Sequence, residues 1–138
     1  MRIVVDTSGW YASAVAADLY HETAKQFLLD HHEFSIVPEV FSEATALLLS
    51  RQGKKLAFYS GELMRKVAIE PINPEMTDVA WQLFKNASSQ VSYVDCVVAA
   101  TAKHKQLPVF TFDKHFLSLG IPIVPHTTPI PTVSVPGL

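Results

Sequence analysis

Two short apolar runs near opposite ends of the chain each lead into an aspartate, and they constrain the fold more than any other feature. The first is Ile3-Val4-Val5, which precedes Asp6 in RIVVDTS; the second lies in PVFTFDKHF and precedes Asp113. Both runs are apolar on successive positions, which is typical of strands buried on both faces of a parallel sheet. The sequence therefore predicts a sheet that is covered by helices on both sides.

Strand-like and helix-like segments alternate through the rest of the chain. Helices are expected at residues 8–17, 21–31, 38–50, 54–67, 74–84 and 93–106. Strands are expected at residues 3–5, 34–37, 68–72 and 109–112, with a last apolar run at 121–124. This alternation predicts a three-layer α/β/α sandwich around a mostly parallel central sheet.

The length and composition favour one folded domain. With 138 residues, of which 49% are hydrophobic and 17% charged, the chain is expected to form a single domain over residues 1–125. Residues 126–138 are rich in proline and carry no Asp, Glu, Lys or Arg, so they are expected to form a tail without a core of its own.

Charge, cysteine content and hydropathy exclude several classes of protein. The net charge of −2 gives no overall basic excess, so nucleic acid could bind only at a local basic surface. The single cysteine, Cys96, excludes an intrachain disulfide. No apolar run reaches the roughly 18 residues that span a bilayer. Asp6 ends the first apolar run after three residues, which is too short for the apolar segment of a secretory signal. A cytoplasmic protein with no membrane partner is therefore expected.

Three aspartates are expected to meet at one edge of the sheet. Ligands of open parallel sheets bind beyond the carboxyl ends of the strands, where the strand order reverses, and Asp6 and Asp113 both follow such ends. Each of them alone could instead cap a helix. Asp95 follows Ser92 by three residues in SYVDCVVAATA, which is the spacing of a capping box at the start of an apolar, buried helix.

Glu43 is the fourth candidate acid, and the cluster as a whole predicts a metal site. Glu43 lies beside the apolar positions Phe41 and Ala44, although a solvated helix face would also explain it. Clustered carboxylates raise one another's pKa unless a cation neutralises them, and their oxygens suit Mg²⁺ or Mn²⁺. The six histidines show no convincing metal-ligand spacing, which argues against zinc. Carboxylate-held metal ions of this kind promote phosphodiester hydrolysis.

The order of VVDTS, a mid-chain helix glutamate, SYVDCVVAATA and VFTFDKHF resembles the PIN domain over about residues 1–125. It is most similar to the VapC-like toxins of bacterial and archaeal toxin–antitoxin pairs. The resemblance implies an endoribonuclease that uses Mg²⁺ or Mn²⁺, forms a homodimer and is silenced by a cognate antitoxin. The catalytic and metal-binding acids that it implies are Asp6, Glu43, Asp95 and Asp113, with Thr7, Ser8 and Thr111 as supporting polar residues.

Basic and aromatic residues near these motifs are candidates for RNA binding. Lys114 directly follows Asp113 and could meet a phosphate near the metal, and Arg51 and Lys54 flank a glycine between two helices. Basic residues at a helix end could instead only complement the helix dipole. Trp10 and Tyr11 could stack on a base, although core packing would also explain them.

Three consecutive leucines predict an interface between two copies of the chain. Leu47, Leu48 and Leu49 point in three directions around a helix, so at least one must face away from the sheet. Together with the PIN resemblance, this predicts a dimer through the helices at residues 39–50 and 54–67. The alternative is that the helices at residues 8–31 cover the same apolar surface.

Three other functions compete with an RNA-cleaving toxin. A haloacid-dehalogenase-type phosphatase would need a second aspartate two residues after Asp6, where Ser8 stands. A housekeeping RNA-processing nuclease would share the same site, but the lack of an added domain favours a toxin. An inactive RNA- or protein-binding module on the same fold would be favoured by the loss of an acid, and all four are present.

Overall fold

The computed structural model describes residues 2–30 and 33–126, so the Pro-rich tail predicted at 126–138 lies outside the described residues except for His126. The helices are α1 (Thr7–Ala14), α2 (His21–Asp30), α3 (Pro38–Gln52), α4 (Lys54–Lys66), α5 (Pro74–Asn86), α6 (Tyr93–Lys105) and α7 (His115–Ser118). The strands are β1 (Arg2–Val5), β2 (Glu33–Ile36), β3 (Ala68–Ile69), β4 (Val109–Phe110) and β5 (Ile123–Val124).

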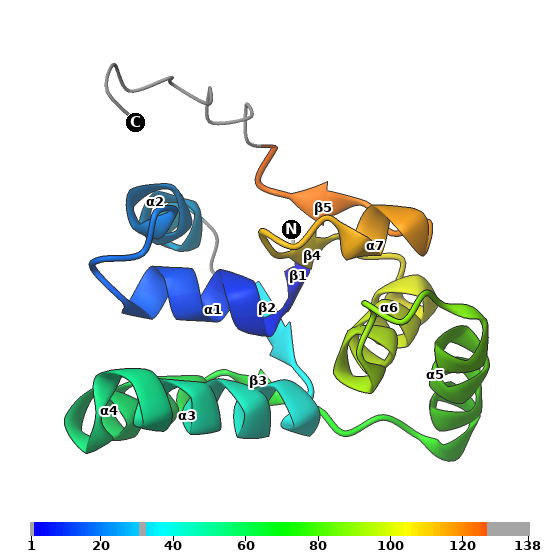
Figure 1. Ribbon diagram of the computed structural model, residues 1–138, viewed down its shortest axis with the longest axis horizontal. Helices are drawn as coiled ribbons and strands as arrows, with labels where there is room; N and C mark the ends of the chain where they lie inside the picture. Colours follow the sequence, from blue (N-terminus) through cyan, green and yellow to red (C-terminus); the bar gives the residue numbers. More distant parts are fainter. Residues whose placement is uncertain (1, 31–32, 127–138) are drawn as a thin grey trace.

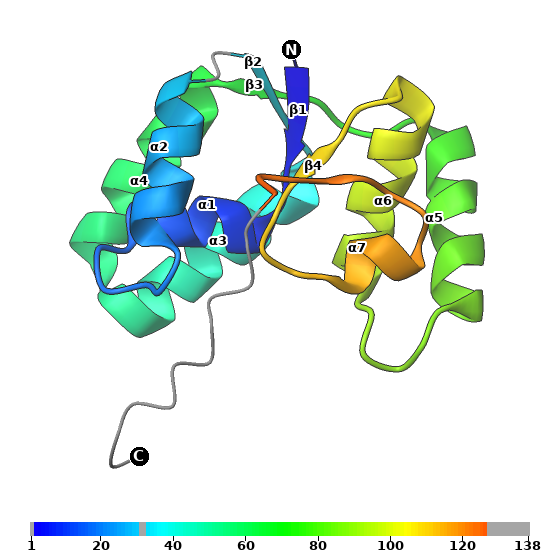
Figure 2. The same ribbon diagram turned by 90° about the horizontal axis from the view of Figure 1, so that it is seen from above.

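The five strands form one parallel sheet in the order β3-β2-β1-β4-β5. Helices α1 to α4 lie on one side of the sheet and α5 to α7 on the other (Figures 1 and 2). This arrangement confirms the predicted α/β/α sandwich. Within the sheet, β2 and β3 lie beyond one edge of β1, and β4 and β5 lie beyond its other edge. The strand order therefore reverses between β1 and β4. The carboxyl ends of these two strands are therefore the expected place for a ligand.

The core confirms that α6 is a buried central helix. Val97, Val98 and Ala99 on α6 are fully buried, as are Ile3 and Val5 on β1. In the part of the chain that the structure describes, no helix combines the length and hydrophobicity needed to cross a membrane.

Several predicted boundaries differ from the structure, including the strands predicted at 109–112 and 121–124, which span only Val109–Phe110 and Ile123–Val124, and one helix was not predicted. The strand predicted at residues 68–72 is only two residues long, because Pro71 follows it and has no N–H for a ladder hydrogen bond. The first helix ends at Ala14 rather than at residue 17. Helix α7 was not predicted, because four residues are too short to show a helical period.

Gly9 allows α1 to pack directly on the end of β4. A Cβ atom at Gly9 would lie 2.5 Å from the carbonyl oxygen of Phe110, closer than any side chain tolerates. The amide of Asp6 also donates a hydrogen bond to that carbonyl, at 3.1 Å. The start of α1 and the end of β4 are therefore fixed against each other, which brings the two motifs of the opening pattern together.

Candidate active site

Asp6 lies between β1 and α1 and is held by two hydroxyl groups. Its side chain is only 3% exposed, and it makes no capping hydrogen bond to α1, so the capping explanation does not hold. Its Oδ2 accepts hydrogen bonds from Thr111 at 2.7 Å and from Ser8 at 3.1 Å. Thr7, the other supporting residue, has a buried hydroxyl with no hydrogen-bond partner among the described residues. Ser8 and Thr111 therefore orient Asp6, and Thr7 does not join their network.

The backbone after β4 extends the same network. The amide of Phe112 donates to the Ser8 hydroxyl at 3.0 Å, and the amide of Asp113 donates to the Thr111 hydroxyl at 2.9 Å. These hydrogen bonds replace the regular ladder just after β4 ends. They fix the turn that carries Asp113 next to Asp6.

Burial and nearby negative charge both oppose ionisation of Asp6. The pKa of Asp6 is raised from 3.8 to about 6; burial is the largest cause, and the negative charge of Asp95 acts in the same direction. The hydrogen bonds from Thr111 and Ser8 act in the opposite direction because they stabilise the charged form. A nearby cation would therefore stabilise the ionised form of Asp6.

Asp95 occupies the first turn of α6 and forms the predicted capping box. The amide of Asp95 donates to the Ser92 hydroxyl at 3.1 Å, and the amide of Ser92 donates to Asp95 Oδ2 at 3.0 Å. Burial raises the pKa of Asp95, and the charges of Asp113 and Glu43 raise it further, whereas the hydrogen bonds from Ser92 lower it. All four predicted acids are thus electrostatically coupled, directly or through Asp95.

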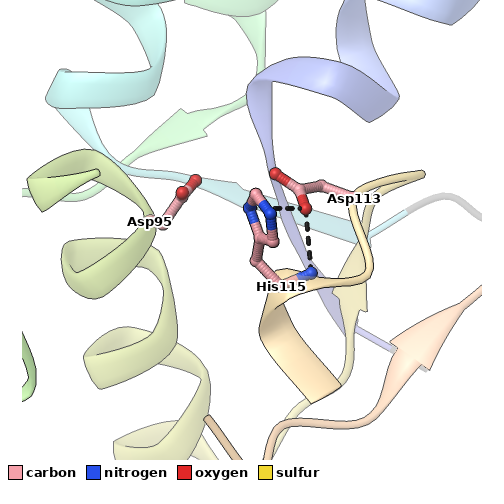
Figure 3. Close-up of side chains that lie close together, drawn as sticks. All are labelled: Asp95, Asp113 and His115. Atoms are coloured by element: carbon pink, nitrogen blue, oxygen red, sulfur yellow. Dashed lines mark hydrogen bonds and ion pairs between the residues drawn. The ribbon is translucent and has the colours of Figure 1, made fainter. Parts of the chain in front are cut away.

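Asp113 lies in the turn between β4 and α7, where it contacts His115. Its Oδ1 accepts a hydrogen bond from the amide of His115 at 2.8 Å. His115 Nδ1 lies 3.0 Å from the same oxygen, but it is not aligned as a hydrogen bond and is otherwise unpartnered. One ligand atom each from Asp95, Asp113 and His115 lie within 4.8 Å of one another. Figure 3 shows the imidazole ring between the two carboxylates.

His115 is a member of this cluster that the sequence analysis did not single out. The available signal was the spacing of two residues between Asp113 and His115, but the contact depends on the turn before α7. Glu43, by contrast, was predicted; it is an exposed residue of α3 that lines a cavity of about 850 Å³ together with Tyr93 and Val94.

A second cavity, of about 300 Å³, is bordered by Asp113. Its lining includes Ser8, Asp113, Tyr11 and Arg51, and the Arg51 guanidinium lies 5.6 Å from the centre of the Tyr11 ring. Tyr11 is therefore available to a ligand. Trp10 is not, because it is buried and its indole N–H donates to Ser60.

The other two predicted substrate-binding lysines lie in different surroundings. Lys114 is exposed and precedes α7. Lys54 lies over the ring of Phe58, at 5.3 Å from its centre, and lines a groove between α3 and α4 rather than either cavity beside the acids.

The donor set fits a divalent cation. Among the described residues, no lysine or arginine forms an ion pair with Asp6, Glu43, Asp95 or Asp113. The site thus combines carboxylate oxygens, two of them with a raised pKa, with one buried imidazole nitrogen that lacks a hydrogen-bond partner. Such carboxylates suit Mg²⁺ or Mn²⁺.

The fold and the site define a parallel α/β sandwich whose acidic side chains gather where the strand order reverses. The chain belongs to the PIN domain family, whose match spans residues 3–122. It is 28% identical over 123 residues to the 23S rRNA-specific endonuclease VapC20 of Mycobacterium tuberculosis, covering 86% of this chain and 94% of that protein.

Solved structures support the same assignment. The crystal structure of M. tuberculosis VapC20, a Sarcin-Ricin loop cleaving toxin, matches with a TM-score of 0.80 at 26% identity and covers 88% of this chain and 98% of that one. FitAcB from Neisseria gonorrhoeae matches with a TM-score of 0.70 at 17% identity, over 91% of this chain and 97% of that one. A toxin–antitoxin complex from Klebsiella pneumoniae matches with a TM-score of 0.67 at 17% identity, over 89% and 96%. The resemblance to VapC-like PIN proteins is thereby confirmed, and the two matches at 17% identity establish the fold.

Proposed function

We propose that this protein is a Mg²⁺- or Mn²⁺-dependent endoribonuclease that acts as the toxin of a toxin–antitoxin pair. The observation that carries the proposal is the meeting of Asp6, Asp95 and Asp113 at the reversal of strand order, with no lysine or arginine of the described residues paired to them. The RNA-cleaving toxin VapC20 shares both sequence and fold with this chain.

The residues of the chain prepare the site for the ion. Thr111 and Ser8 hold one oxygen of Asp6, Ser92 holds one oxygen of Asp95, and the amide of His115 holds one oxygen of Asp113. These bonds orient the three carboxylates, and the exposed Glu43 of α3 is near enough to Asp95 for its charge to raise the pKa of Asp95. A bound divalent ion supplies a Lewis acid for the phosphate and lowers the pKa of attacking water.

RNA phosphates approach from the open side of this cluster. Lys114 is exposed directly beside Asp113, and Arg51 lines the cavity that Asp113 borders. Both can neutralise phosphate charge without competing for the carboxylates. Lys54, the first residue of α4, lines the groove between α3 and α4 and would meet RNA only outside the two cavities beside the acids.

RNA cleavage with and without metal tests the activity. Purified protein is expected to cleave RNA with added Mg²⁺ or Mn²⁺ and to lose that activity in EDTA, and restored metal should restore cleavage. Full cleavage in EDTA by a homogeneous preparation would contradict the proposal. RNA binding without cleavage under every metal condition would support an inactive binding module instead.

The toxin role requires a test in cells. Expression of the wild-type chain alone is expected to arrest growth, whereas an Asp95→Asn variant is expected to be harmless. Harmless expression of a chain that is active in vitro would favour a housekeeping role in RNA processing. Because the reaction is on RNA and is stopped by a protein antitoxin, we place the chain in the cytoplasm.

The same proposal includes a homodimer and an antitoxin partner. Of the three consecutive leucines, Leu48 is buried and Leu49 is 53% exposed, as the pattern predicted. Leu49 and Phe58 line a groove of about 440 Å³ between α3 and α4. Another part of α4 lies towards α2 rather than towards this groove, because Leu63 and Leu28 of α2 line the same cavity. Light scattering at micromolar concentration should give the mass of a dimer, and a monomer unchanged by concentration would contradict it.

A further inference from the structure

We propose that His115 is a nitrogen ligand of the cation that Asp95 and Asp113 hold, so that the site prefers Mn²⁺ to Mg²⁺. The inference rests on the proposed metal-dependent function. It goes beyond the four carboxylates, because it gives the site a mixed set of oxygen and nitrogen donors.

The first argument is the spacing of the donor atoms. Nδ1 of His115 lies 3.0 Å from Oδ1 of Asp113. Adjacent ligands of an octahedral ion with bonds of about 2.1 Å are about 3 Å apart. One carboxylate oxygen from each of Asp95 and Asp113 and one ring nitrogen of His115 lie within 4.8 Å of one another. This spacing is compatible with three ligands of one ion after a small adjustment of the side chains.

The second argument is that Nδ1 has no hydrogen-bond partner among the described residues, where its one polar contact is with Asp113 Oδ1. Buried polar atoms normally form a hydrogen bond, and exceptions call for a specific explanation such as an ion. The Nδ1 atom of His115 is buried and lacks a hydrogen bond. His21 offers a contrast within the same chain, because its Nδ1 lies 2.9 Å from the carbonyl oxygen of Ala12.

The third argument is that the backbone fixes His115 in place. The next residue, Phe116, is fully buried in the core, and the amide of His115 is bonded to Asp113 Oδ1. The histidine is therefore held beside Asp113 by its neighbours on both sides. Figure 3 shows its ring directed into the space between Asp95 and Asp113.

A nitrogen donor changes which ion binds best. Mg²⁺ requires nearly ideal octahedral oxygen coordination, whereas imidazole suits the later first-row metals. Mn²⁺ accepts oxygen and nitrogen donors together. The competing explanation is that His115 only balances the charge of Asp113, in which case it would make no bond to the ion and the ion preference would not depend on it.

Electron spin-echo spectroscopy of the Mn²⁺-loaded protein distinguishes the two explanations. With ¹⁵N-labelled histidine, the wild-type protein is expected to show coupling from a nitrogen bound directly to Mn²⁺. This coupling should disappear in His115→Phe and remain in His104→Asn, a matched control in which an exposed histidine of α6 is changed. Calorimetry on the same proteins measures Mn²⁺ and Mg²⁺ affinity without reference to RNA cleavage.

His115→Asn provides a sharper comparison, because its amide oxygen replaces Nδ1 at a similar distance from the backbone. Its ratio of Mn²⁺ to Mg²⁺ affinity is expected to fall about tenfold, since even the outer partners of metal ligands change affinity by about 10- to 100-fold. His104→Asn should keep the wild-type ratio.

The possible failures are distinguishable. Mn²⁺ binding without nitrogen coupling, or coupling that persists in His115→Phe, would overturn the inference and leave the proposed nuclease standing. Failure of the folded wild-type protein to bind either ion would overturn the metal-dependent function and the inference together.

Discussion

Glu70 and the aspartates of the candidate active site have opposite electrostatic surroundings. Glu70 accepts a hydrogen bond from Lys105 and lies 3.4 Å from Arg2, and the Lys105 hydrogen bond is the main reason why the pKa of Glu70 is lowered. Asp6 and Asp95 have no such partner among the described residues, and burial raises the pKa of both. Lys105 and Arg2 therefore neutralise Glu70, whereas no lysine or arginine of the described residues neutralises Asp6 or Asp95.

The largest expected effect is a difference in RNA cleavage between a variant of Asp95 and a variant of Glu70. Asp95→Asn should lower the rate of RNA cleavage by about a thousandfold or more, because losing several kcal/mol of metal-assisted catalysis has about that effect. Glu70→Gln should leave the rate within about twofold, because its partners are the chain's own cations. Cleavage assays at saturating Mn²⁺ measure both. Equal losses would show that the two groups do not differ in function.

The second prediction concerns stability without metal. The folded pKa of Asp6 is about 6 and its usual value is 3.8, so the folded state binds more protons than the unfolded state between these values. Stability should therefore fall as pH rises through this window, by about 3 kcal/mol in total for this group. Asp6→Asn should remove that loss and be more stable than wild type at pH 8 in EDTA.

Urea denaturation at pH 8 and near pH 4 provides the measurement. The two proteins should differ little at the acidic pH, where Asp6 is mostly protonated in the folded state. A wild-type protein that gains stability from pH 4 to pH 7 relative to Asp6→Asn would contradict the cause assigned to the raised pKa.

The third prediction concerns stability with metal. A ligand at a hundredfold excess over its dissociation constant stabilises the folded state by about 2.7 kcal/mol. Mn²⁺ should raise the melting temperature of the wild type and of Glu70→Gln, and much less that of Asp95→Asn. Thermal melts with and without Mn²⁺ measure this shift. A full shift in Asp95→Asn would place the ion elsewhere.

The smallest effect is expected at Glu70 itself. A carboxylate with a lowered pKa stabilises the fold above its usual pKa of 4.5 and loses this contribution as pH falls through its lower folded pKa. About a third of the Glu70 side chain is exposed, so Glu70→Gln should cost only about 0–1 kcal/mol at pH 7. Denaturation at low and at 0.5 M salt tests this, since screening should reduce the difference. A cost above 2 kcal/mol would show a structural role that the exposed ion pairs do not explain.

The sequence was sufficient for the parts of the site that depend on local patterns. Asp6 and Asp113 follow strand ends, and Asp95 follows Ser92 at capping-box spacing, so each could be placed at the same edge once a parallel sheet was inferred. The structure brings them to that edge. Ser8 and Thr111 were assigned only through the family resemblance, and their contact with Asp6 supports that assignment.

The parts that could not be predicted depend on contacts between distant segments or on one turn. The hydrogen bond from Trp10 to Ser60 joins residues 50 positions apart, and the hydrogen bond from Lys105 to Glu70 joins residues 35 positions apart. No periodicity of the sequence encodes either pair. The position of His115 depends on a short turn whose geometry follows from the burial of Phe116.

The hydrogen bond between Thr111 and Asp6 has a consequence for the biosynthesis of the protein. The two residues are 105 positions apart, and their strands lie side by side in the sheet. At about 5–20 residues per second, a ribosome needs roughly 5 to 20 seconds to reach Thr111 after it has incorporated Asp6. Until then the nascent chain carries its first acid but lacks the strand that completes the site. The proposed catalytic site is thus incomplete until β4 has been translated.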